Sequence, residues 1–168
     1  MEKSLSIVGD NKESAMKNLE LKIPPVVLVA IIAVGMWAVS RIALNSHFTF
    51  PYVEWWSAGM VLLGICSAIA GVLQFRKSGT TVDPRVPDQS SNLVVSGVYR
   101  YSRNPMYLGF LLALCGWCLF LGNVVSALFL PAFIIYMNRF QIVPEERFMQ
   151  EKFAESYHQY KAQVRRWI

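Results

Sequence analysis

Residues 23–44 read IPPVVLVAIIAVGMWAVSRIAL, with a single charge, Arg41, near the far end of the run. A helix of this length can cross a bilayer, and Pro24-Pro25 suits the first turn of a helix. A cleaved signal peptide is the alternative, because Ala38-Val39-Ser40 fits a small-x-small cleavage pattern. The long polar lead and the further apolar segments downstream favour a membrane helix that stays in the protein.

The composition of the whole chain points the same way. Of its 168 residues, 54% are apolar and 16% are charged, and the mean hydropathy of +0.36 is too high for an ordinary soluble domain. Three cysteines in apolar surroundings cannot form a disulfide framework, and the sequence has no zinc pattern. Cys115 and Cys118 form Cys-x-x-Cys inside an apolar run, where packing of small side chains is the expected role. We therefore predict no metal site.

Four apolar segments predict an all-α integral membrane protein with about four transmembrane helices. The expected spans are residues 23–44, 55–75, 106–121 and 124–140, and aromatic residues between the first two suit the headgroup level. Gly122-Asn123 suits a tight turn between the last two. Sixteen residues give a helix of about 24 Å against a hydrocarbon thickness of about 30 Å, so this hairpin is expected to span poorly or to thin the bilayer. Small residues on the second span favour close helix packing: Gly59, Gly64, Ser67, Ala68 and Gly71.

From Pro144 the pattern changes to charged and aromatic residues, which predicts an amphipathic interfacial helix over residues 144–166. The expected organisation is a cytoplasmic tail over residues 1–22 and one membrane domain over residues 23–168. Within that domain, residues 76–105 form a polar loop that is too long for a simple turn. Connections of this kind often carry function.

The distribution of the cations predicts the orientation. Sixteen Lys and Arg against eleven Asp and Glu give a net charge of +5 and a pI near 9.2. Four spans with the N-terminus inside place every Lys and Arg except Arg41 on the cytoplasmic side, as the positive-inside rule requires. The positive charge is thus explained by topology, and we expect no nucleic-acid partner. A multi-pass protein with both termini in the cytoplasm follows, in the inner membrane if the chain is bacterial.

The densest candidate site is GVYRYSRNPMYLG at residues 97–109, at the mouth of the third span. Pro105 biases Asn104 away from helix and suits the first helical turn, where peptide N–H groups can face an anion. Arg100 and Arg103 add fixed positive charge, and the tyrosines offer ring faces and polar tips. The alternative is a membrane-interface belt in which the arginines reach lipid phosphates.

A second candidate is Glu145-Glu146, directly after Pro144. Two acids close to the membrane and opposite the Arg-Asn-Pro loop could bind the amine of a ligand or a ribose diol. The alternative is electrostatic capping, because carboxylates in the first turn of a helix are stabilised by the helix dipole.

Together these stretches resemble the isoprenylcysteine carboxyl methyltransferase and phospholipid methyltransferase superfamily, and in particular its bacterial members. The resemblance rests on residues 93–99 and 103–109, on Pro144-Glu145-Glu146, and on the aromatic and basic residues up to Arg165-Arg166-Trp167. Residues 80–87 are similar to the lead-in of the bacterial members, so that the likeness covers roughly residues 72–168.

This resemblance implies an S-adenosylmethionine-dependent membrane methyltransferase whose lipophilic acceptor enters from the bilayer. It implies Arg103 and Glu146 as catalytic residues. It also implies a set of residues that bind the methyl donor: Leu93, Val94, Gly97 and Tyr99 for the adenosyl part, Arg103, Asn104, Pro105 and Tyr107 for the amino acid part, and Glu145 or Glu146 for the ribose or ammonium. Two positions depart from the family pattern, because many members have His at Asn104 and Gly at Ala154. Asn can form hydrogen bonds, but unlike His it does not titrate near neutral pH.

Two other functions stay open at this point. A membrane NAD(P)H-dependent reductase of sterol-type substrates has a similar Arg-x-Pro-x-Tyr motif, but it typically carries an acid where Phe110 follows Gly109. A non-catalytic membrane protein is the other. The acceptor of a methyltransferase could be a carboxylate, a thiol or an amine on a lipid, and the sequence does not reveal the oligomeric state.

Overall fold

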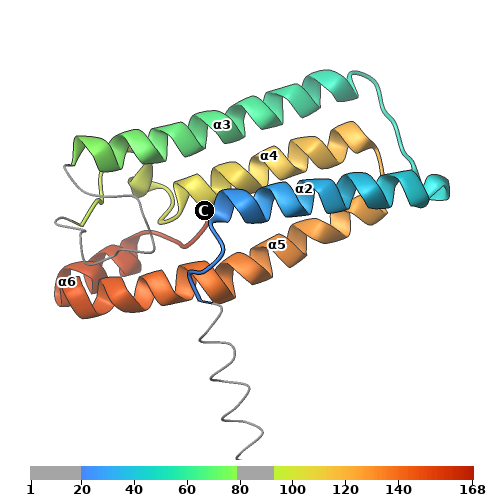
Figure 1. Ribbon diagram of the computed structural model, residues 1–168. Coiled ribbons are helices and arrows are strands. Elements are labelled where there is room, and N and C mark those ends of the chain that lie inside the picture. Colours follow the sequence, from blue (N-terminus) through green and yellow to red (C-terminus); the bar gives the residue numbers. More distant parts are fainter. Residues whose placement is uncertain (1–19, 79–92) are drawn as a thin grey trace, which may run out of the picture.

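The structure is a computed structural model that describes residues 20–78 and 93–168. These residues form a bundle of helices and contain no β-strand, as the sequence predicts. The long helices lie side by side (Figure 1). The N-terminal tail up to residue 19 and residues 79–92 of the predicted loop lie outside the described residues. The α-helices are α2 (Pro25–Ile42), α3 (Val53–Lys77), α4 (Pro105–Leu121), α5 (Phe129–Met137) and α6 (Val143–Gln163).

The bundle has an apolar exterior as well as an apolar core. Met36, Phe133 and Met137 are fully buried between α2, α4 and α5, whereas Ile31 on α2 and Leu62 on α3 are 58% and 62% exposed. Three helical stretches are long and apolar enough to cross a membrane, while α4, with 17 residues, is shorter. Exposed leucine and isoleucine on several long helices are expected where the surrounding solvent is lipid. The chain is thus a multi-pass membrane protein.

The helices α3 and α4 approach each other closely, and this contact depends on small residues. A Cβ placed on Gly64 would lie 2.5 Å from the carbonyl oxygen of Gly109, so only glycine fits at this crossing. Ser67 donates a hydrogen bond to the carbonyl of Pro105 at 2.8 Å. The predicted packing role is therefore confirmed for Gly64, but it is wrong for Gly59, which has no atom within 4 Å of its Cβ position.

The turn between α4 and α5 forms at Gly122-Asn123, as predicted. Gly122 has φ +57°, and its N–H bonds the carbonyls of Cys118 and Leu119, which is the usual glycine end of a helix. The buried Asn123 side chain donates to the carbonyl of Ala43 at 2.9 Å. This turn is therefore fixed to the end of α2.

The last expected span and the C-terminal helix are not separate elements. A π-helical turn, η5 (Asn138–Ile142), joins α5 to α6, so that residues 125–163 form one continuous helical stretch. Pro144 cannot donate a backbone hydrogen bond to Phe140, four residues earlier. That carbonyl instead accepts a bond from the N–H of Leu21 at 3.0 Å. The wider turn and the replacement donor together allow the helix to continue through the proline.

The C-terminal helix expected over residues 144–166 is kinked and ends earlier. Ala154 has φ +40° and ψ −113°, a kink that divides α6, and the helix ends at Gln163. Glycine adopts such a conformation without strain, but alanine does not. The kink turns the last helical part back toward the bundle, as the red end of the ribbon shows in Figure 1.

Candidate active site

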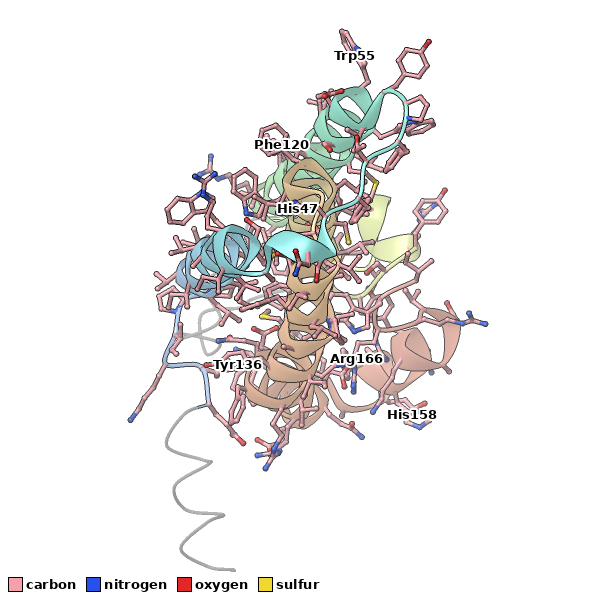
Figure 2. The ribbon with its side chains drawn as sticks, turned by 90° about the vertical axis from the view of Figure 1, so that its right-hand side faces the viewer. His47, Trp55, Phe120, Tyr136, His158 and Arg166 are labelled. Carbon is pink, nitrogen blue, oxygen red and sulfur yellow. The ribbon has the colours of Figure 1, made fainter. Side chains whose placement is uncertain are left out.

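Four parts of the chain meet at one end of the bundle. They are the short helix η3 (Gly97–Arg100), the start of α4, the charged part of α6 and the C-terminal segment, residues 164–168. This is the end where α3 finishes with Arg76 and Lys77. Arg166 of the C-terminal segment lies over α6 in Figure 2, whereas His158 points away from the bundle.

One side of this region is an apolar and aromatic cluster. Tyr99, Tyr157 and Tyr160 are buried together with Val94 and Val164, and Leu93 packs against them. The Tyr160 hydroxyl donates to the carbonyl of Tyr99 at 2.7 Å. Burial raises the pKa of Tyr157 to about 12, so its phenol stays neutral at physiological pH. The kink at Ala154 thus brings two tyrosines of α6 into contact with residues that were predicted to bind the adenosyl part of the methyl donor.

Gly97 has a structural task in this region. Its φ of +63° lies in the left-handed region that favours glycine, and a Cβ there would lie 2.7 Å from the side-chain oxygen of Gln74. The Gln74 amide donates to the Ser96 hydroxyl at 2.6 Å. Gly97 therefore lets the loop turn tightly against the end of α3.

The predicted catalytic pair is in direct contact. Arg103 Nη2 lies 2.9 Å from Glu146 Oε1, and the two side chains are only 9% and 10% exposed. A second guanidinium completes the contact, because Arg166 donates from Nε to Oε1 at 3.1 Å and from Nη2 to Oε2 at 2.6 Å. Both oxygens of Glu146 are thus occupied by arginine, and the hydrogen bond to Glu146 raises the pKa of Arg166.

One nitrogen of Arg103 lacks a partner. Its Nε is buried and has no hydrogen-bond acceptor among the described residues, although Nη1 reaches the carbonyl of Lys161 at 3.4 Å. A buried donor without an acceptor is costly, and in native proteins it usually indicates a missing ligand or water. An anionic group placed beside Arg103 would satisfy it.

The neighbouring acid has a different environment. Glu145 Oε1 accepts a hydrogen bond from the Tyr107 hydroxyl at 2.5 Å, and no cation contacts this carboxyl group in the described part of the chain. Because burial disfavours the carboxylate, the pKa of Glu145 rises to about 7. The Tyr107 bond opposes this rise, and the charge of Glu146 adds to it. Two adjacent glutamates are therefore chemically distinct.

The C-terminal segment is held against the turn that begins α4. Asn104 Nδ2 donates to the carbonyl of Arg166 at 2.9 Å, and the Arg103 N–H donates to the carbonyl of Arg165 at 3.1 Å. Trp167 Nε1 donates to Asn138 Oδ1 at 3.1 Å, which adds an anchor on the π-helical turn. The side chain of Asn104 therefore binds this chain's own backbone.

The structure thus brings together most of the residues that the sequence nominated. Arg103 contacts Glu146 and Tyr107 contacts Glu145, and the adjoining apolar cluster contains Leu93, Val94 and Tyr99. Pro105 is buried as the first residue of α4, and Gly97 serves the loop turn. Arg166, Tyr157 and Tyr160 were not among the nominated site residues, yet all three contact this region. The adjacent acids were a signal for Arg166, because a buried carboxylate needs a cation.

Comparison with known proteins identifies the family. The family model for phospholipid methyltransferases matches residues 52–156, which include α3, η3, α4 and both glutamates. The chain belongs to this family. The match favours methyl transfer over the reductase alternative. The described residues contain no group of three or more His, Cys, Asp or Glu side chains that could hold a metal ion.

Three relatives of this family member match different lengths of its chain. An uncharacterized protein of Haemophilus influenzae is 46% identical over 63 residues, which is 38% of this chain and all of that protein. The protein-S-isoprenylcysteine O-methyltransferase of Schizosaccharomyces pombe is 28% identical over 118 residues, 70% of this chain and 50% of the relative. Protein-S-isoprenylcysteine O-methyltransferase A of Arabidopsis thaliana is 32% identical over 130 residues, 72% and 64% respectively. The chain thus spans about half to two thirds of these two enzymes.

Proposed function

We propose that the protein is a membrane methyltransferase that uses S-adenosylmethionine and acts on a lipophilic acceptor. Family membership and the names of the relatives support the reaction class. The observation that carries the proposal is the buried, unpartnered Nε–H of Arg103, which lies within a cluster of arginines and glutamates where α4 begins. The positive charge suits the carboxylate of the methyl donor, and the neighbouring apolar helix suits a lipophilic acceptor.

The residues present fit the methyl donor. Its amino acid part carries a carboxylate, which Arg103 Nε–H could bind, and an ammonium, for which Glu145 is the acid without a cation partner among the described residues, since Glu146 is occupied by two guanidinium groups. Its adenosyl part would lie among Leu93, Val94 and Tyr99 in the aromatic cluster. Asn104 and Pro105 would shape the turn that presents Arg103.

S-adenosylmethionine supplies a methyl group already activated by the sulfonium, so the protein needs little acid–base chemistry when the acceptor is a carboxylate or a thiolate. The task left to this chain is to align two molecules and exclude water. Arg103 would orient an anionic group, and the buried tyrosines would keep that side of the site dry. An amine acceptor must lose a proton, and Glu145, with a pKa of about 7, could take it near neutral pH.

Calorimetric titration of the detergent-purified protein with S-adenosylhomocysteine, beside NADPH, tests this proposal. We expect saturable binding of S-adenosylhomocysteine and none of NADPH. Arg103→Ala and Glu145→Gln should each weaken binding about tenfold or more, because each removes a charged or polar contact. Arg100→Ala and Glu151→Gln, whose side chains are exposed nearby, are the matched controls and should bind like wild type.

Binding of NADPH alone would favour the reductase, and binding of neither ligand would favour a non-catalytic protein. If S-adenosylhomocysteine binds, methyl transfer from labelled S-adenosylmethionine to lipids bearing a carboxylate, thiol or amine would identify the acceptor class. Equal binding by Arg103→Ala and Arg100→Ala would contradict the assignment of Arg103.

A further inference from the structure

The site contains more positive charge than a single ion pair needs. Two guanidinium groups, from Arg103 and Arg166, share the carboxylate of Glu146, so this three-residue group carries a net charge of +1. Without the Arg166 side chain the same group would be neutral. The ability of Arg103 to attract an anion therefore depends on a residue at the far end of the chain.

The two arginines contact Glu146 in different ways. Arg166 binds Glu146 through two nitrogens, while Arg103 binds it through Nη2 alone and keeps its buried Nε–H without an acceptor. Arg166 thus provides the stronger partner for the carboxylate. Arg103 is left with a buried donor that has no hydrogen-bond acceptor in the described part of the chain.

The main chain of Arg166 is fixed independently of its side chain. The Asn104 amide holds its carbonyl at 2.9 Å, and the next residue, Trp167, is bonded to Asn138 at 3.1 Å. These two contacts tie the C-terminal segment to the start of α4 and to the π-helical turn. Many members of the superfamily have a titrating histidine at the position of Asn104. Here the Asn104 side chain, which does not titrate, holds the C-terminal segment by a hydrogen bond.

We infer that Arg166 is a positioning residue for recognition of a carboxylate, namely that of the amino acid part of the methyl donor. It neutralises Glu146 and so leaves Arg103 with both the charge and the free N–H to bind that group. This inference rests on the proposed function and goes beyond it, because Arg166 acts through Glu146 and Arg103 and does not itself touch the ligand.

Two probes that differ in this carboxylate test the inference. S-adenosylhomocysteine carries the amino acid part, and 5′-methylthioadenosine has the same nucleoside and sulfur without it. Wild type should bind the first more tightly. Arg166→Ala should lose about tenfold or more in affinity for S-adenosylhomocysteine while its affinity for 5′-methylthioadenosine changes less than about twofold. Arg165→Ala, an exposed arginine beside it, is the matched control and should retain the wild-type preference.

Arg166→Lys keeps the positive charge but loses the two-nitrogen geometry, so we expect an intermediate preference. This variant also serves if Arg166→Ala does not purify as a helical, monodisperse protein. Equal affinities for S-adenosylhomocysteine in the Arg166 and Arg165 variants would overturn the inference. So would a parallel loss of both probes, since that would indicate a collapsed pocket. Failure of wild type to bind either probe would overturn the proposed function and this inference with it.

Discussion

At the scale of single residues, the glutamate pair has a testable consequence for stability. The pKa of Glu145 is raised to about 7, so between about pH 4.5 and 7 the folded protein holds a proton that the unfolded chain has released. The free energy of unfolding must therefore fall as the pH rises through this range. We expect the melting temperature in detergent to fall more from pH 5 to pH 8 for wild type than for Glu145→Gln. Glu151→Gln should follow wild type, and identical slopes for wild type and Glu145→Gln would contradict the raised pKa.

The kink at Ala154 gives a second prediction at this scale. An alanine at φ +40° is strained by its Cβ, whereas glycine is not, so Ala154→Gly should stabilise the protein by about 1 kcal/mol. Ala162→Gly, at an exposed helical position in the same element, should destabilise it by about 1 kcal/mol instead. Thermal unfolding of both variants in the same detergent measures the difference. Destabilisation by both substitutions would mean that position 154 is helical.

At the scale of the elements, the crossing of α3 and α4 holds the site end of the bundle together. Gly64→Ala would place a methyl group 2.5 Å from the Gly109 carbonyl, so the helices must separate. We expect a loss of about 2 kcal/mol or more and weaker ligand binding. Gly59→Ala lies on the same helix with open space around it, and it should be neutral or stabilising. Equal melting temperatures for the two variants would exclude a close crossing at Gly64.

The elements also show how far the sequence allows prediction. The lengths of the apolar runs predicted all four apolar helices, and Gly122-Asn123 predicted the turn between α4 and α5. Both signals are local in the sequence. The continuous helix through Pro144 was missed, since the replacement donor for Phe140 comes from Leu21, far away in the sequence. The resemblance to the methyltransferase superfamily nominated Arg103 and Glu146, but the contact of Arg166 with Glu146 depends on a kink at Ala154 that no local pattern predicts.

At the scale of the whole molecule, the two ends of the bundle differ in charge. The site end carries Arg76, Lys77 and Arg103, and α2 places Arg41 in its last turn, at the other end. That opposite end is the one facing the viewer in Figure 2, with His47 and the outward-pointing Trp55. A surplus of cations at one end is the pattern of a protein whose cationic end stays in the cytoplasm.

We therefore predict that both termini and the candidate site face the cytoplasm. Green fluorescent protein fused after Ile168 should fluoresce, whereas alkaline phosphatase at the same point should be inactive. Alkaline phosphatase inserted between α2 and α3 near His47 should be active and provides the matched control. Moving the charge by combining Arg76→Glu and Lys77→Glu with added lysines beside Arg41 should reduce the orientation bias, because the cations near the spans determine it. An active phosphatase after Ile168 in the unmodified protein would put the site on the opposite side of the membrane, and the methyl donor would then have to be supplied there.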